Sequence, residues 1–316
     1  MDNPHRIGIL AIPGFALMSY AALTEPLRAA TLLGATPPYA VDIFCTGDVP
    51  AAASQGMCVA PTRPLAEAGS VGRLFVVAGG RPEHFDDAGT LAALRRADRA
   101  GVTLGGVSGG PVVLATAGLM TGRRMTVHWE HADALREIAP RAALDRALYV
   151  IDRGRITCAG GTAPMDMMHA LIAADHGAAL ARAVSDWFLH TEVRPAAGPQ
   201  RAGLAERLGT THPALLEAAA ALEAETAQPP ALADLARRAG VSPRHLLRLF
   251  REHLGTTPMA YGRQARLETA RRLIRGAPLP LSAIAYATGF ASPAHLANAH
   301  RAAYGVPPSA LRGRAG

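Results

Sequence analysis

Apolar side chains follow two alternating spacings over the first 190 residues. Short unbroken apolar runs predict buried strands, and stretches with helical spacing separate them. The predicted strands are Ile7–Ile12, Val41–Cys45, Leu74–Ala78 and Val102–Val107. The predicted helices are Ser19–Leu33, Leu91–Ala100, Pro111–Ala117 and Met165–Ala174. This alternation is typical of α/β proteins, so we expect a doubly wound, mostly parallel sheet with helices on both faces.

A different pattern fills the last third of the chain, where one passage occurs twice. Each copy predicts a short helix, a glycine turn and a second helix. The identities, fifty residues apart, pair Ser242, Pro243, His245, Leu246, Arg251, Gly255 and Pro258 with Ser292, Pro293, His295, Leu296, Arg301, Gly305 and Pro308. Gly240 matches Gly289 at an offset of 49, so the second copy has one more residue in its turn. Between the copies, Pro258–Arg275 predicts one long helix that Gly276 ends.

The second helix of the first copy has two faces of opposite character. Its apolar positions are Leu246, Leu249, Phe250 and Leu254. Arg244, Arg248 and Arg251 recur at helical spacing on the other side. A helix-turn-helix DNA reader needs this division, because arginine forks bind base edges and phosphates in the major groove. Solvation of an exposed face is the alternative, and the duplication favours DNA binding.

The second copy carries less charge at the matching positions. Alanine and asparagine replace two arginines, at Ala294 and Asn298, while Arg301 is retained. We predict a weaker grip on DNA from this copy, with Asn298 suited to an adenine edge. His300 replaces the core phenylalanine, and a buried, satisfied histidine is favoured over a switch. The candidate DNA-contacting residues are Arg244, His245, Arg248 and Arg251, then Ala294, His295, Asn298 and Arg301.

The segment from about Pro213 to Arg312 resembles the DNA-binding domain of the arabinose-regulator (AraC/XylS) family. The resemblance rests on LADLARRAGVSPRHLLRLFREHLGTTPMAYGRQARLETARRLI, LSAIAYATGF and YGVPPSALR. It implies a double helix-turn-helix domain that binds double-stranded promoter DNA, as an activator beside RNA polymerase and as a homodimer. Two readers on one rigid helix predict DNA contacts about one helical repeat (~34 Å) apart. The departures from the family, at Leu296, Asn298 and His300, concern the second reader.

Net charge is concentrated in the same segment. The chain has 32 arginines, no lysine and 25 acidic residues, for a formal net charge of +7. From His212 onward there are 13 arginines and 6 acids, so the preceding residues balance to zero. This distribution is expected if the C-terminal segment faces a polyanion.

Length and composition bear on the number of domains and on whether the chain is a membrane, secreted or metal-binding protein. A chain of 316 residues suits two domains, and no apolar run approaches the ~20 residues of a membrane span. The N-terminus lacks a signal-peptide layout. The three cysteines, Cys45, Cys58 and Cys158, have no metal-site spacing. We expect reduced, mostly buried thiols in a cytoplasmic protein without a metal or cofactor.

Glycine-rich segments follow the predicted strands, and ligands of parallel sheets bind at the carboxyl ends of strands. These segments are Pro13–Phe15, Ala78–Arg81, Gly106–Gly110 and Cys158–Thr162. The third has the G-x-S-x-G spacing of a nucleophile elbow around Ser108, and His128 follows. A nucleophilic serine needs a histidine within reach and an acid to orient it. A serine hydrolase or amidase using Ser108 and His128, tethered to DNA, is therefore the alternative function.

Residues 5–190 resemble the class I glutamine amidotransferase-like, or PfpI-like, fold, which is flavodoxin-like. In that family the elbow carries a cysteine and a histidine follows, positions held here by Ser108 and by His128 in MTVHWE. Enzymatic relatives often place a glutamate where this chain has no acid, between Gly14 and Ser19; the next acid is Glu25. The resemblance implies a vestigial elbow and no enzyme.

A PfpI-like domain followed by an AraC-type domain resembles regulators of arginine, glycine betaine or carnitine catabolism. The resemblance implies a sensor for a small amine or amino-acid-like effector. Elbow amides would bind a carboxylate, Trp129 would cover a quaternary ammonium, and Glu25 or Glu130 would balance its charge. For Trp129, core packing is the favoured alternative. The candidate ligand-binding residues are Ser108, Gly109, His128, Trp129, Glu25 and Gly80.

Composition also predicts the domain boundaries. Residues 191–212, TEVRPAAGPQRAGLAERLGTTH, hold prolines, glycines and charges with poor periodicity, which is typical of a linker. We expect a PfpI-like ligand-sensing domain over residues 1–190, a linker over 191–212 and an all-α, AraC-type DNA-binding domain over 213–316.

Overall fold

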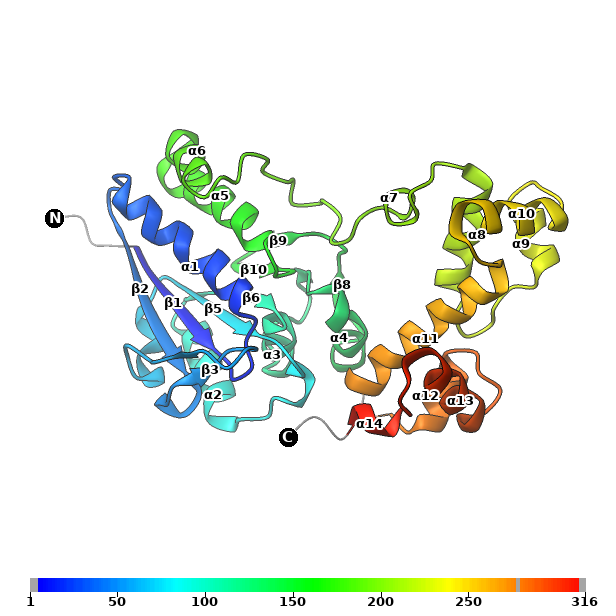
Figure 1. The fold of residues 1–316 in the computed structure, drawn as a ribbon. Coiled ribbons are helices and arrows are strands. Elements are labelled where there is room, and N and C mark those ends of the chain that lie inside the picture. The colour runs from blue at the N-terminus through cyan, green and yellow to red at the C-terminus, as the bar shows by residue number, and fades with distance from the viewer. Residues whose placement is uncertain (1–4, 277–278, 313–316) are drawn as a thin grey trace. The chain divides into compact units, whose positions relative to one another are not determined.

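The computed structural model describes residues 5–276 and 279–312, and the chain divides into two compact units between Gln200 and Arg201. The first unit is built on a six-stranded sheet (Figure 1). Its strands, in spatial order, are β2 (Tyr39–Cys45), β1 (His5–Ala11), β5 (Arg73–Ala78), β6 (Thr103–Ser108), β10 (Arg155–Cys158) and β9 (Tyr149–Asp152). All neighbours are parallel except β10 and β9. This order is flavodoxin-like, which confirms the predicted fold class.

The sequence pattern located four of these strands and missed the hairpin β9–β10. Each of its strands has only four residues, too few for a clear period. The hairpin turns at Arg153 and Gly154. Both residues have positive φ, as the two central residues of a type I′ turn require. β10 places the glycine loop at Gly160 beside β6, so the missed strand completes the edge where a ligand site is expected.

Helices cover both faces of the sheet, as predicted. One face carries α1 (Leu17–Leu32), α5 (Ala163–His176) and α6 (Ala178–Trp187). The other carries α2 (Ala88–Arg99), α3 (Gly110–Thr116) and α4 (Ala132–Ile138). Successive residues of one strand point into the two cores: Ile9 packs under α1 and α5, while Leu10 packs under α2 and α3. The strands are therefore buried on both sides and read as unbroken apolar runs.

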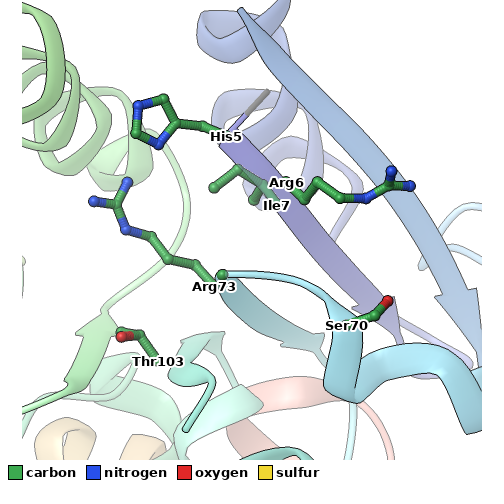
Figure 2. Close-up of a pocket in the computed structure, with 7 residues that line it drawn as sticks. His5, Arg6, Ile7, Ser70, Arg73 and Thr103 are labelled. Carbon is green, nitrogen blue, oxygen red and sulfur yellow. The ribbon is translucent and has the colours of Figure 1, made fainter. Parts of the chain in front are cut away.

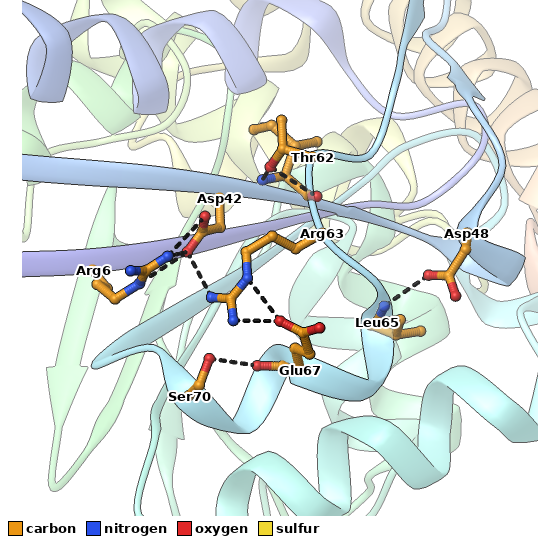
Figure 3. A network of polar contacts seen from close by, with 9 residues as sticks. Arg6, Asp42, Asp48, Thr62, Arg63, Leu65, Glu67 and Ser70 are labelled. Atoms are coloured by element: carbon orange, nitrogen blue, oxygen red, sulfur yellow. Dashed lines mark hydrogen bonds and ion pairs between the residues drawn. The ribbon is translucent and has the colours of Figure 1, made fainter.

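Short elements complete the first unit. They are η1 (Thr46–Asp48), β3 (Ala51–Ala52), β4 (Cys58–Val59), η2 (Leu65–Ser70), η3 (Pro82–His84), β7 (Arg124–Met125), η4 (Trp129–His131) and β8 (Ala143–Leu144). A polar network fastens η2 to the sheet (Figure 3). Asp42 of β2 accepts from Arg6 at 2.9 Å and from Arg63 at 3.1 Å, and Arg63 also pairs with Glu67 of η2.

The second unit is all helical. After a short α7 (Leu204–Leu208), its helices are α8 (Pro213–Ala224), α9 (Leu232–Arg238), α10 (Pro243–Leu254), α11 (Pro258–Gly276), α12 (Leu281–Ala287), α13 (Pro293–Tyr304) and α14 (Ser309–Arg312). Helices α9–α10 and α12–α13 are the two predicted helix-turn-helix copies, and α11 is the predicted long helix between them. Each copy has its own small core, around Phe250 and around Phe290.

The two copies interlock through glycines and one arginine. A Cβ at Gly262 of α11 would lie 2.7 Å from Leu222 of α8, and one at Gly289 would lie 2.4 Å from the Thr226 carbonyl. Arg266 of α11 donates to the Gly289 carbonyl at 2.7 Å and stacks over Phe290 at 5.1 Å. The turn of the second copy is therefore held between α11 and the α8–α9 connection.

Within the segment predicted as linker, residues 191–212, the chain passes from the first compact unit to the second. Residues 191–200 pack on the first unit, because Arg194 bonds to Asp166 and Gln200 to Thr126. The remainder begins the second unit and contains α7. Over the described ranges, no helix is long and apolar enough to span a membrane. Of the cysteines, Cys45 and Cys158 are buried and Cys58 is exposed, and all three are free thiols.

Candidate functional site

The elbow forms where β6 ends at Ser108 and α3 begins at Gly110. Ser108 has a φ of 60°, in the left-handed region that non-glycine residues rarely adopt. Glycines make this turn possible: a Cβ at Gly106 would lie 2.6 Å from the Pro111 nitrogen, and one at Gly110 would lie 2.0 Å from the Val76 carbonyl oxygen. The motif therefore specifies a strained strand-to-helix turn, as the G-x-S-x-G spacing predicts.

Ser108 is only 5% exposed and packs against the glycine loop after β10. A Cβ on Gly160 would lie 2.7 Å from the Ser108 Cβ and 2.9 Å from the Ser19 hydroxyl. Ser19, in the first turn of α1, is fully buried and accepts a hydrogen bond from the Gly161 amide at 2.8 Å. Sequence reasoning searched this turn for an acid and missed the serine. Its place in the first turn of the helix that follows β1 is the signal that could have identified it.

His128 lies beside the elbow but is not arranged as a general base. Its amide donates to the Ser108 carbonyl at 3.3 Å, and its Nδ1 accepts from the Glu130 amide at 3.3 Å. Burial lowers the pKa of His128, so the ring is neutral near pH 7, and with Nδ1 as acceptor its proton is on Nε2. Across the described residues, the Ser108 hydroxyl makes no hydrogen bond to this ring and no carboxylate orients the ring. The relay of a serine hydrolase is not formed.

Backbone groups of the elbow are already hydrogen-bonded within the protein. In hydrolases the amide after the nucleophile helps to stabilise an oxyanion. Here the Gly109 amide donates to the Ala78 carbonyl at 3.0 Å. Gly80 has a φ of 62° and lies in the turn that follows β5, next to the elbow. The Gly109 amide is therefore already bonded and is not free to stabilise an oxyanion.

Two predicted ligand residues lie further from Ser108. Trp129 is 39% exposed, and its ring centroid is 5.3 Å from that of His128. Core packing of Trp129, the favoured alternative, is wrong, because the ring lies at the surface on the short turn η4. Glu25 is ion-paired with Arg28 at 2.7 Å and is about 9 Å beyond Ser19 along α1. Its contact with an effector stays a prediction.

An open depression of about 470 Å³ lies at the opposite edge of the sheet, at the amino ends of β1, β5 and β6 (Figure 2). His5, Arg73 and Thr103 are among its lining residues. Its arginines are already neutralised, since Arg6 pairs with Asp42 and Arg73 with Asp175. The depression therefore offers little free charge to a ligand. Among the residues that the structure describes, no group of three or more His, Cys, Asp and Glu could hold a metal ion.

The first reading helix, α10, has the two faces that the sequence predicts. Leu246 and Phe250 are fully buried, whereas Arg244, Arg248 and Arg251 are exposed. Only Arg248 has an acidic neighbour, Glu252 at 3.8 Å, and in the described ranges Arg244 and Arg251 have no salt-bridge partner. Ser242 caps the helix by accepting from the His245 amide at 3.2 Å. The guanidinium groups are thus presented to solvent on a well-terminated helix.

The second reading helix, α13, has the same length and the same serine cap as α10, but its exposed side chains differ. Ser292 caps it by accepting from the His295 amide at 3.1 Å. Ala294, Asn298 and Arg301 are exposed at the positions of the three arginines. His300 is fully buried, as predicted, and its Nδ1 bonds to the Val306 carbonyl at 2.8 Å, whereas its Nε2 is buried without a partner, so this core histidine is only half satisfied.

Comparison with known families matches both units. The DJ-1/PfpI family matches residues 5–174, and a helix-turn-helix domain matches residues 235–314. The HTH-type transcriptional regulator GlxA of Rhizobium meliloti is 48% identical over 315 residues, covering 99% of this chain and 97% of that protein. The HTH-type transcriptional regulator CdhR of Pseudomonas aeruginosa is 40% identical over 300 residues, covering 95% and 89%.

Solved structures agree on the fold of the first unit. An AraC family transcriptional regulator from Pseudomonas putida matches with a TM-score of 0.54 at 23% identity, covering 58% of this chain and 100% of that chain. A THiJ/PfpI family protein from Pseudomonas syringae matches with a TM-score of 0.52 at 25% identity, covering 61% and 78%. The chain belongs to the helix-turn-helix transcriptional regulators that join a DJ-1/PfpI domain to an AraC-type DNA-binding domain.

Proposed function

We propose that this DNA-binding regulator responds to a small effector held at the elbow of its DJ-1/PfpI domain, without catalysis. The observation that carries the proposal is the hydrogen bonding of His128: its Nδ1 accepts from the Glu130 amide, and among the described residues its ring makes no hydrogen bond to the Ser108 hydroxyl. The strained Ser108 and the buried Ser19 hydroxyl supply polar groups for a bound molecule, and the absence of a base bonded to Ser108 among the described residues supports binding without cleavage.

A small amine or amino-acid-like molecule is the effector class that these residues favour. A carboxylate would lie against Ser108, Gly109 and Gly80, where the Gly109 amide is already bonded to Ala78, so the Nε2 proton of His128 would be its donor. The exposed Trp129 ring would cover an ammonium group, a contribution of about 0.5–2 kcal/mol. Glu25 or Glu130 would balance the charge.

A thermal-shift screen of the full chain tests the effector. Glycine betaine, L-carnitine and L-arginine are the first ligands, because each joins a carboxylate to a cationic nitrogen. A ligand at a hundred times its dissociation constant adds about 2.7 kcal/mol to the free energy of unfolding. The shift should disappear in Ser108→Trp, which fills the elbow. No shift with any ligand of the class would exclude this effector chemistry.

Catalysis is the second candidate, and Ser108→Ala separates it from sensing. The full chain should show no turnover on a panel of esters and amides. Turnover that Ser108→Ala abolishes would overturn the sensor proposal and restore the hydrolase.

On the DNA side, we propose that Arg244, His245, Arg248 and Arg251 supply most of the contacts and that Ala294, His295, Asn298 and Arg301 add a weaker half-site. The unpaired guanidinium groups of α10 support this division. Action as a homodimer beside RNA polymerase is part of the same proposal. Gel shifts with a promoter duplex, and sedimentation of the complex, test affinity and stoichiometry; Arg244→Ala with unchanged affinity would remove α10 from the interface.

A further inference from the structure

Residues 190–200, called here the strap, end the first unit and lead to the DNA-binding unit. Most of the strap is exposed, but it is bonded to the first unit at its beginning, middle and end. In the middle, the Ala196 carbonyl accepts from the Leu148 amide at 2.8 Å. At its beginning, the fully buried Asp166 of α5 accepts from the Arg194 amide at 2.8 Å and from the Arg194 guanidinium at 2.6 Å. His190 is a further partner of Asp166, at 2.9 Å. Arg194 also donates to the Thr162 hydroxyl at 3.0 Å.

The end of the strap is held by the side chain of Gln200. Its amide nitrogen lies 3.0 Å from the Thr126 hydroxyl, 3.0 Å from the Val127 carbonyl and 2.8 Å from the Ala147 carbonyl. Two N–H groups serve three acceptors, and the Gln200 carbonyl oxygen is buried without a partner. An unsatisfied polar atom weakens this attachment, so it can be released at lower cost than a fully bonded one.

The attachments at Arg194 and Gln200 lie next to walls of the elbow, whereas Ala196 is bonded at the start of β9. Thr162 directly follows Gly161, whose amide bonds to Ser19, and Gly160, which packs against Ser108. Val127 directly precedes His128, whose amide bonds to the Ser108 carbonyl. A displacement of either wall therefore changes the bonds of Arg194 or Gln200, and no other described part of the first unit continues into the second.

We infer that the strap couples the elbow to the DNA-binding unit, with Arg194 and Gln200 as positioning residues that hold it on the two walls. The inference rests on the proposed function, since it requires an effector site at the elbow. A ligand that moves the segment of His128 weakens or strengthens the hydrogen bonds of Gln200. The strap then changes how far the residues after Gln200 can extend from the first unit. Coupling of this kind is reciprocal, so DNA bound to the second unit must change the elbow in return.

Reciprocity allows a test that needs no effector. The chain has two tryptophans, and Trp187→Phe leaves Trp129, two residues from Val127, as the single reporter. Acrylamide quenching of Trp129 is measured in the full-length Trp187→Phe protein, free and saturated with a duplex that this protein selects from a random-sequence library. The same pair of measurements is made on Gln200→Ala and on Arg194→Lys. The matched control is Gln55→Ala, which changes an exposed glutamine in a turn of the same unit.

The expected result is a change of Trp129 quenching on DNA binding in the parent and in Gln55→Ala, and loss of that change in Gln200→Ala. Arg194→Lys, which keeps the charge but not the forked bonds, should reduce it. A melting curve identifies a Gln200→Ala protein that does not fold, and Arg194→Lys then decides. Duplex binding with unchanged Trp129 quenching in the parent, or a full change in both variants, would overturn the inference while the regulator function stands. A parent that binds no duplex would instead remove the proposed function.

Discussion

The elbow and the reading face of α10 differ in burial and in charge. At the elbow, Ser108 and Ser19 are buried, and a Cβ added to Gly106, Gly110 or Gly160 would lie 2.0–2.9 Å from neighbouring atoms. On α10 the arginines are exposed and largely unpaired, above a core of Leu246 and Phe250. Close packing makes the first site sensitive to shape and burial. Exposure makes the second site sensitive to charge, while its fold depends on residues underneath.

The largest effect should come from a methyl group at the elbow. Gly110→Ala would place a Cβ 2.0 Å from the Val76 carbonyl oxygen, a backbone atom that cannot turn away. We expect a loss of about 3 kcal/mol or more in the free energy of unfolding, measured by urea denaturation. Gly89→Ala in α2, whose Cβ would lie 3.5 Å from Asp87, is the control. Equal stability of the two variants would contradict the packing described for the elbow.

Removing charge from α10 should lower DNA affinity and leave stability nearly unchanged. Arg244→Ala combined with Arg248→Ala should weaken DNA binding by about 2–4 kcal/mol and flatten its salt dependence, with little change in stability. Asn298→Ala on α13 should cost less affinity. Arg96→Ala with Arg99→Ala, which removes the same charge from the first unit, controls for net charge. Gel shifts at several salt concentrations measure all four proteins, and a similar loss from the control would place the effect in bulk charge.

Low pH should destabilise the first unit through a buried histidine beside the elbow. Burial lowers the pKa of His131, next to the elbow, to about 4, whereas the unfolded chain binds this proton near pH 6.5. The unfolded state therefore takes up the proton first, and stability is lost as pH falls from about 6.5 to 4. About 2 kcal/mol should disappear between pH 7 and pH 5. His131→Gln should reduce this loss and the exposed His84→Gln should not, in melting curves of the first unit's transition.

The smallest effects should be nearly equal in the two readers. Ser242→Ala and Ser292→Ala each remove one N-cap bond, at a cost of about 1 kcal/mol in stability. Because α10 carries the exposed arginines, only Ser242→Ala should also weaken DNA binding measurably. Ser282→Ala in α12 is the control. Affinity losses of the same size from both caps would show that the readers contribute equally.

Local patterns were enough to predict the reading helices. Ser242, Gly255 and the spacing of Leu246 and Phe250 act within three turns of one helix, so a single stretch of sequence contains the information. The elbow was predictable for the same reason, because Gly106, Ser108 and Gly110 build it from adjacent residues. The alternation of elements predicted a parallel sheet covered on both faces, and the resemblance to the PfpI-like fold implied its flavodoxin-like order.

Contacts between distant residues could not be predicted in this way. Arg194 meets Asp166 across 28 positions, and Gln200 meets Thr126 across 74. No periodicity marks either pair, and the composition of residues 191–200 resembled a free linker. Ser19 reaches Gly161 over 142 positions for the same reason. Only the sheet, by placing β1, β6 and β10 with their carboxyl ends on one edge, brings these segments together.

The fit of Gly262 against α8 and of Gly289 against Thr226 has a consequence for the promoter. Because the two readers pack closely at these glycines, a promoter whose half-sites do not match their spacing must itself be distorted to fit. The base steps between the half-sites must then bend or twist, and easily deformed steps such as TA cost less energy to distort. Bases that no side chain touches should therefore influence which promoters are occupied.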